Sequence, residues 1–116
     1  MAQEAAPYFN VTTIAVRPGK IDEVYASFAE LAREVMEHEP DAKMYRFYKT
    51  QGKDEIVIME KFASREAFFA HLKADHMAIW KKKYASQQAE WFTGADALVA
   101  RVMAADGPAA GGFDRP

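Results

Sequence analysis

The sequence contains no cysteine, and this excludes disulfide bonds, thiolate metal ligands and a thiol nucleophile. It also has no apolar run near the ~20 residues that a membrane-spanning helix needs. Neither sign of charge dominates, because 15 Lys and Arg residues stand against 17 Asp and Glu residues. Nucleic-acid-binding domains carry a clear positive excess. The composition therefore predicts that neither a nucleic acid nor a membrane is a partner.

Glycine and proline are few, with 6 and 5 residues, while half of the chain is apolar and 13% is aromatic. This is the composition of a folded domain, and 116 residues leave room for one. We expect that domain over residues 8–104. Residues 1–7 are an expected tail without the basic start of a secretion signal, which favours a cytoplasmic protein. Residues 105–116 are rich in Gly and Pro and are predicted to form a disordered tail.

Apolar periodicity divides the chain into helix-like and strand-like stretches. From Ile21 to Glu37 apolar side chains recur at three- and four-residue steps, which predicts an amphipathic helix that ends before Pro40. A second helix is predicted to begin after Ser64, a favourable N-cap residue, and to break near Ala74. β-branched and aromatic residues predict four strands, at Tyr8–Val16, Ala42–Thr50, Glu55–Phe62 and Ala95–Ala104.

The predicted order is β-α-β-β-α-β. This is the order of the ferredoxin-like α+β architecture, in which two helices cover one face of a four-stranded antiparallel sheet. The strands carry little charge on either side, so we expect a partner to cover the second face of the sheet. A small domain also encloses a ligand cavity more easily with a second subunit. We therefore expect a homodimer.

Several segments resemble the antibiotic biosynthesis monooxygenase (ABM) family. The most specific is Glu-Lys-Phe-Ala-Ser at residues 60–64, followed by His71-Leu72, and weaker likenesses lie at residues 16–20 and 37–41. The likeness extends over residues 9–103. It implies a dimeric α+β barrel with a pocket between sheet and helices. It also implies oxygenation of a small aromatic, quinol-type or polyketide-like substrate by O₂, with no flavin, metal or other cofactor.

Some members of the family degrade haem, and the resemblance to these is incomplete. They carry an Asn on the first strand, as Asn10 does here. They also carry Trp where this chain has Phe62, and a haem-binding His near the position of Lys81. These two differences favour a function other than haem degradation.

His71 matches the His-Leu position of the family, and the resemblance makes it the first candidate for a catalytic base. Oxygenation without a cofactor needs a base, because a phenolate or enolate gives an electron to O₂ far more readily than its neutral acid. A histidine titrates near neutral pH and suits this role. The structural alternative is an ion pair between His71 and Asp75, four residues further along the helix.

Asn10 and Tyr45 are the candidates for orienting substrate oxygens. Asn10 is a polar residue on an apolar strand, so its amide needs a partner in a ligand or in the protein. Tyr45 has a hydroxyl that can donate, although an aromatic residue on a strand also packs in cores. Glu60, in the family-like segment, is predicted to form an ion pair with Arg46 on the neighbouring strand.

Aromatic and histidine side chains are expected to line the substrate pocket or, alternatively, the core or an interface. These are Phe62, Phe68, His76, Trp80 and Tyr84. His76 follows His71 by five residues, which is about 140° around a regular helix at 100° per residue. The two histidines would not share a metal ion on such a helix, so no metal site is expected, although a break near Asp75 would change this.

Three functions fit this sequence. The resemblance favours a cofactor-independent monooxygenase. The first alternative is a non-catalytic dimeric barrel that binds a small hydrophobic ligand. The second is an isomerase or dehydratase that uses His71 without oxygen. The same fold and pocket serve all three.

Overall fold

The computed structural model describes residues 7–103, 111–113 and 115–116. Residues 1–6 of the first predicted tail, residues 105–110 and 114 of the second, and residue 104 at the end of the predicted domain lie outside these described residues. Within the described part of the chain, no helix combines the length and the apolar character that crossing a membrane requires.

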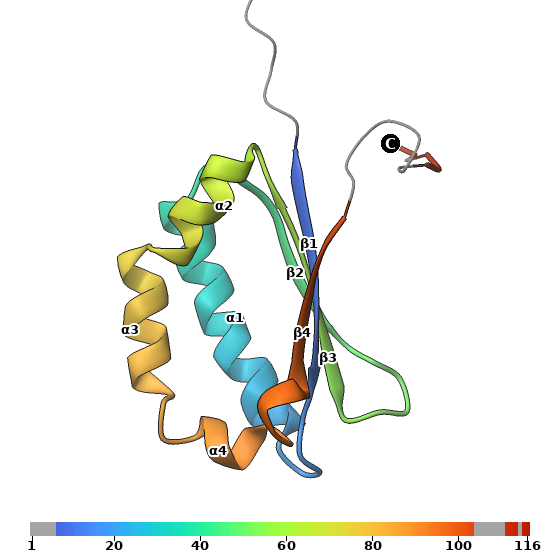
Figure 1. Cartoon of the computed structure of the whole chain (residues 1–116), viewed down its shortest axis with the longest axis vertical. Helices are drawn as coiled ribbons and strands as arrows, with labels where there is room; N and C mark the ends of the chain where they lie inside the picture. The colour runs from blue at the N-terminus through green and yellow to red at the C-terminus, as the bar shows by residue number, and fades with distance from the viewer. Residues whose placement is uncertain (1–6, 104–110, 114) are drawn as a thin grey trace, which may run out of the picture.

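Four antiparallel strands form one sheet in the order β2-β3-β1-β4. With helices on one side of this sheet (Figure 1), the predicted ferredoxin-like α+β fold is confirmed. The last strand begins at Leu98 and not at Ala95, because Ala95–Ala97 form a short 3-10 helix. The strands are β1 (Tyr8–Ala15), β2 (Ala42–Lys49), β3 (Glu55–Phe62) and β4 (Leu98–Met103).

Helix α1 (Ile21–His38) supplies most of the helical side of the core. Its apolar side chains fall on one stripe, as the sequence periodicity predicts, and this stripe packs on the sheet. Burying one such side chain stabilises the fold by roughly 1.5–3 kcal/mol. The core residues of α1 are Val24, Phe28, Leu31 and Val35, and those of the sheet include Ile14, Ile56 and Ile58.

The second helical region divides into α2 (Arg65–Leu72) and α3 (Asp75–Lys83), followed by the short α4 (Gln88–Trp91). Ser64 caps α2, as predicted, by accepting a hydrogen bond from the backbone N–H of Ala67 at 3.1 Å. Ala74 then takes an extended conformation, with φ −65° and ψ 146°. The predicted helix break is therefore confirmed, and α3 leaves α2 in a new direction (Figure 1).

Helix α3 is bonded to α1 and not to the sheet. The indole Nε1 of Trp80 donates to the backbone oxygen of Ser27 at 2.8 Å. The Lys83 ammonium lies 2.6 Å from Glu30 Oε1, and the Tyr84 hydroxyl also bonds to Glu30. These contacts hold α3 away from strands β1 and β4, and space for a cavity remains between them.

The opposite face of the sheet is covered by no helix of the described residues (Figure 1). Its central positions are apolar or hydroxylated and half-buried, among them Val11, Thr13, Val57 and Met59. Val99 and Met103 extend this face onto β4, where they are 38% and 39% exposed. This face is the one for which the sequence predicts a partner.

Candidate functional site

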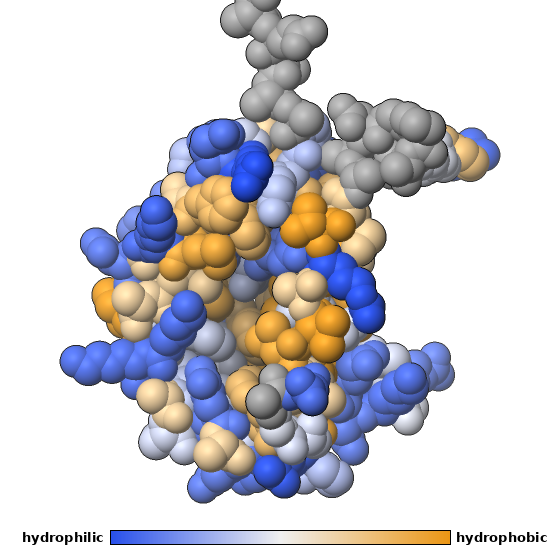
Figure 2. Space-filling model, in the orientation of Figure 1, coloured by the Kyte–Doolittle hydropathy of each residue, from blue (hydrophilic) through white to orange (hydrophobic). Residues whose placement is uncertain are grey.

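A cavity of about 750 Å³ lies between the sheet and helices α2 and α3. Figure 2 shows this side of the molecule hollowed beside β4, with hydrophobic side chains around the hollow. The volume falls in the range of small-molecule sites, ~300–1,000 Å³. We call it the sheet–helix cavity; its polar lining includes Asn10, Thr12, Tyr45, Glu60 and His71, and its apolar lining includes Phe68, Leu72, Met77, Trp80, Phe92 and Leu98.

His71 lies in the last turn of α2 and is only 2% exposed. Its Nδ1 lies 2.9 and 3.0 Å from the two carboxyl oxygens of Glu39. Because a carboxylate only accepts hydrogen bonds, Nδ1 carries the proton that is donated. The other ring nitrogen, Nε2, then presents its lone pair toward the cavity, 3.9 Å from an oxygen of Glu60.

The alternative pairing of His71 with Asp75 does not form, and Glu39 takes that place. Asp75 is exposed and begins α3 after the helix break, so the four-residue spacing no longer brings the two side chains together. Aromatic rings from β3 and α2 pack against the imidazole instead. The Phe62 ring centroid lies 5.1 Å from that of His71, and the Phe68 centroid lies 6.5 Å away.

Asn10 and Glu60 form a buried polar pair at the sheet wall of the cavity. They lie opposite each other on β1 and β3, and Asn10 Nδ2 donates to Glu60 Oε2 at 2.9 Å and to Thr12 Oγ1 at 3.3 Å. Both amide hydrogens of Asn10 are thus used within the protein, so its amide oxygen is the group left for a ligand hydroxyl. Burial raises the pKa of Glu60, while the hydrogen bond from Asn10 and the nearby His71 oppose that rise.

The predicted ion pair between Glu60 and Arg46 is wrong. In the β2–β3 register Tyr45 lies opposite Glu60, and Arg46 lies opposite Met59. Successive side chains of a strand point to opposite faces, so Arg46 projects from the uncovered face of the sheet. The sequence pattern placed the two residues on neighbouring strands but did not fix the register.

Tyr45 faces the same cavity from β2, with its ring centroid 5.9 Å from that of His71. Burial raises the pKa of its hydroxyl far above the usual range, and the negative charges of Glu60 and Glu39 add to this. The hydroxyl therefore stays protonated and is a hydrogen-bond donor. Asn10, Tyr45 and His71, from three different elements, line one cavity.

Only some of the residues predicted to line the pocket do so. Phe68 and Trp80 line the cavity. Phe62 is fully buried and packs against the rings of Phe68 and His71. Tyr84 bonds to Glu30, away from the cavity lining. His76 lines a separate, open groove on the other side of His71.

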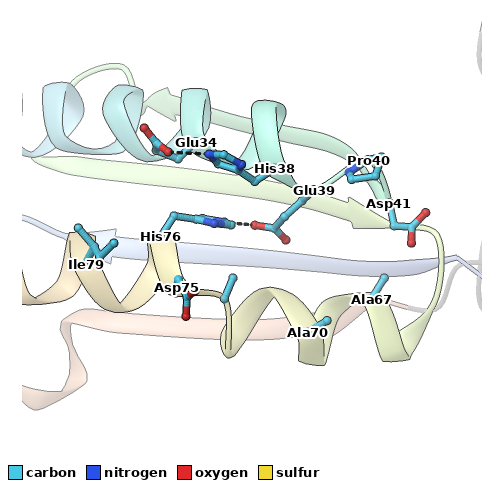
Figure 3. Close-up of a pocket in the computed structure, with 11 residues that line it drawn as sticks. Glu34, His38, Glu39, Pro40, Asp41, Ala67, Ala70, Asp75, His76 and Ile79 are labelled. Carbon is cyan, nitrogen blue, oxygen red and sulfur yellow. Dashed lines mark hydrogen bonds and ion pairs between the residues drawn. The ribbon is translucent and has the colours of Figure 1, made fainter.

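Glu39 is the residue of this site that sequence reasoning missed. The sequence marks it only as the end of the first helix before Pro40. In the structure it follows α1 as its C-cap and extends its side chain toward α2 and α3 (Figure 3). It accepts from His71 and, at 2.5 Å, from His76 Nε2. The signal was a Glu-Pro pair at a helix end, which predicts a chain reversal but no side-chain partner.

The arrangement can hold a small ligand and move a proton. An imidazole nitrogen, a neutral phenol and an amide oxygen face a cavity whose other walls are largely apolar. Such a site binds a flat apolar molecule and recognises a few of its oxygens. The nitrogen of His71 that faces the cavity is suited to accept a proton, because Glu39 stabilises the imidazolium that forms.

Comparisons with known proteins agree with this architecture. Residues 7–83 match the family model described as antibiotic biosynthesis monooxygenase. A search of the curated proteins gave no match. Sixty-eight chains of solved structures match, and three of them illustrate the likeness.

A candidate antibiotic biosynthesis monooxygenase from Caulobacter crescentus is 23% identical, with a TM-score of 0.72 over 85% of this chain and 89% of that chain. Rv0793 from Mycobacterium tuberculosis is 20% identical, with a TM-score of 0.71 over 90% and 100%. A candidate monooxygenase of the same kind from Nitrosomonas europaea is 16% identical, with a TM-score of 0.68 over 95% and 100%. These identities show a common fold. The family model covers well over half of the residues, and this chain belongs to the antibiotic biosynthesis monooxygenase family.

Proposed function

We propose that this chain is a cofactor-independent monooxygenase for a small aromatic, quinol-type or polyketide-like substrate that binds in the sheet–helix cavity. His71 is the base, and Tyr45 and Asn10 orient the oxygens of the substrate. The observation that carries this proposal is the orientation of the His71 ring. Its Nδ1 is bonded to Glu39, so the free lone pair of Nε2 is directed to the cavity side.

The first chemical step is proton transfer. A phenolic O–H, or the acidic C–H of an anthrone, gives its proton to His71 Nε2, and the resulting imidazolium lies between the carboxyl groups of Glu39 and Glu60. The Tyr45 hydroxyl stabilises the negative oxygen of the substrate by donating a hydrogen bond. The apolar walls exclude water, which would otherwise protonate the anion and trap reactive intermediates.

The substrate supplies all four electrons that reduce O₂. For an anthrone, the anion transfers an electron to O₂, a C–O bond forms at the ring methylene, and the O–O bond breaks. The methylene carbon becomes a carbonyl with one oxygen atom. The second oxygen atom leaves as water with the two methylene hydrogens. No external reductant is needed.

The proposal includes a homodimer in which the uncovered faces of two sheets pack together. The half-buried apolar positions on that face, such as Val11 and Met59, support it, because an exposed apolar sheet face is unfavourable in water. Packing there would leave the helices and the cavity of each subunit on the outside. Light scattering tests the assembly, and a stable monomer would contradict it.

Oxygen uptake tests the reaction. Chelator-treated protein is mixed with anthrone in an oxygen electrode, and we expect one O₂ consumed for each anthraquinone formed. His71→Ala should lower the rate about 10²- to 10⁴-fold, the range of general-base contributions. His38→Gln changes an exposed histidine that does not line the cavity and should retain the wild-type rate.

The same assay separates the alternatives. Thermal stabilisation by anthrones and quinols, with no oxygen uptake from any of them, would replace the enzyme with a binding module. A product formed without oxygen uptake would indicate an isomerase if it has the mass of its substrate, and a dehydratase if it has lost one water. Full activity of His71→Ala would remove His71 from the base role.

A further inference from the structure

The open groove on the other side of His71 has a chemistry of its own. It has a volume of about 560 Å³, and its lining includes His38, Glu39, Asp75 and His76 (Figure 3). The chain has three histidines in all. His71 contacts Glu39 from the buried side, and the His38 and His76 rings stack at 5.6 Å between centroids. Helices α2 and α3 thus bring His71 and His76 to the Glu39 carboxyl group, whereas His38 on α1 pairs with Glu34 at 3.3 Å.

We propose that Glu39, His71 and His76 bind a divalent transition-metal ion such as Zn²⁺. One oxygen of Glu39, Nδ1 of His71 and Nε2 of His76 are the ligand atoms, and all of them lie within 4.8 Å of one another. Two imidazoles and one carboxylate are a common ligand set of Zn²⁺ and of Fe²⁺, with further positions open to water.

The distances between these atoms suit an ion of that size. Bonds of ~2.0–2.2 Å from a tetrahedral Zn²⁺ place its ligand atoms about 3.3 Å apart. Glu39 Oε2 lies 2.9 Å from His71 Nδ1 and 2.5 Å from His76 Nε2. Small side-chain rotations therefore open the hydrogen-bonded cluster around an ion. Binding releases the two protons that the imidazoles donate to Glu39.

The groove gives a metal ion access to the three proposed ligand side chains. The side chains of Glu39 and His76 are each 12% exposed, and that of His71 is 1% exposed. The ion would enter through the groove and keep its open positions on the groove side. Because each ligand comes from a different helix, the ion would join the end of α1 to α2 and α3.

The surroundings of His71 give independent support. Histidines that bind a metal through one ring nitrogen usually donate the other N–H to a carboxylate. Glu60 Oε1 lies 3.9 Å from His71 Nε2, on the opposite edge of the ring from the proposed ion. Glu60 is itself fixed by Asn10, so a small shift of the His71 ring would bring Nε2 within hydrogen-bond distance of this carboxyl group.

The occupied site would also regulate the proposed reaction, and this consequence rests on the proposed function. A metal ion on Nδ1 leaves the proton on Nε2, so the nitrogen that faces the cavity becomes a donor and no longer accepts a proton. Saturating Zn²⁺ should therefore inhibit oxygen uptake at least 10-fold.

Isothermal titration of chelator-treated protein with Zn²⁺ tests the site without any assay of activity. We expect one Zn²⁺ per chain. His76→Gln should weaken binding about 100-fold, because a direct ligand is lost, and its partly exposed position spares the core. The matched control is His38→Gln, which changes the neighbouring histidine and should bind Zn²⁺ within about 3-fold of the wild type.

The outcomes are distinct. No saturable binding by the wild type, or binding that His38→Gln loses and His76→Gln keeps, overturns the metal site and leaves the proposed function untouched. Binding at the expected site without inhibition of oxygen uptake overturns the role of His71 as base. Binding together with inhibition supports both.

Discussion

The two edges of the His71 ring lie in opposite environments. The Nδ1 edge faces Glu39, which lines the open groove, and is bonded to both of its carboxyl oxygens. The Nε2 edge faces the sheet–helix cavity, and its nearest carboxyl oxygen, on Glu60, is 3.9 Å away. The Nε2 edge is therefore the edge of the ring that a ligand in the cavity can reach.

The two carboxyl groups beside the ring also differ. Glu39 sits at a helix end and bonds to two imidazoles from separate helices. Glu60 sits within a strand, and burial raises its pKa. One carboxyl group positions the ring, and the other is held at some cost in stability.

The largest effect is expected from Phe62→Ala, which removes a ring that packs against the His71 imidazole and so supports both of its edges. Phe62 is fully buried, and its ring packs against those of His71 and Phe68. The cavity left behind should lower the free energy of unfolding by about 3–5 kcal/mol, as measured by urea denaturation. His71 would lose its fixed orientation, so oxygen uptake should fall as well.

Two control variants test whether the loss of stability is specific to Phe62→Ala. Phe69→Ala changes the adjacent aromatic residue, which is 41% exposed, and should change the free energy of unfolding by less than about 1 kcal/mol. Phe62→Leu keeps much of the volume and should cost no more than about 1.5 kcal/mol. Equal losses from Phe62→Ala and Phe69→Ala would mean that Phe62 does not anchor the ring.

Glu39→Gln is expected to have the second-largest effect, on rate. The amide oxygen of Gln still accepts from His71 Nδ1, so the ring keeps its orientation, but the negative charge that stabilises the imidazolium is gone. We expect kcat to fall about 10- to 100-fold with little change in KM.

Glu37→Gln is the control for that charge. It removes a carboxylate two residues away, on an exposed position of α1, and should leave kcat within about 2-fold of the wild type. A parallel loss in both variants would assign the effect to the general field of the helix end.

The sequence predicted the fold better than the contacts within the site. The order of strands and helices along the chain, the first helix and the break near Ala74 follow from local periodicity and capping, so they could be derived from neighbouring residues. The partner of His71 could not, because Glu39 is 32 residues away and reaches it only after α1 and α2 are packed. The Arg46 error has the same origin, since β2–β3 register decides which face a side chain occupies.

The proposed metal ligands also come together through packing that the sequence does not reveal. Spacing on a regular helix separates His71 from His76 by about 140°, and this argued against a shared ion. The extended Ala74 between them removes that constraint. The position of the break was predictable from sequence, but the direction in which α3 leaves it depends on the contacts of Trp80 and Tyr84 with α1.

The smallest of the three effects is expected from Glu60→Gln, and it has the opposite sign. Burial raises the pKa of Glu60 in the folded protein, so over a pH interval above its usual value of ~4.3 the folded state keeps a proton that the unfolded chain has lost. Stability of the wild type must therefore fall as the pH rises through that interval. Gln carries no titrating proton, and its amide oxygen still accepts the hydrogen bond from Asn10.

Melting temperatures at pH 4 and pH 8, in the presence of a chelator, measure this difference. At pH 4 the carboxyl group is largely protonated in both states, and variant and wild type should nearly coincide. At pH 8 we expect Glu60→Gln to be more stable by about 1 kcal/mol, whereas Glu90→Gln, at an exposed position, should show no such gain. A variant that is less stable at pH 8 than the wild type would mean that the charge of Glu60 contributes to folding, and the contrast between the two edges of His71 would then reflect two ordinary structural ion pairs.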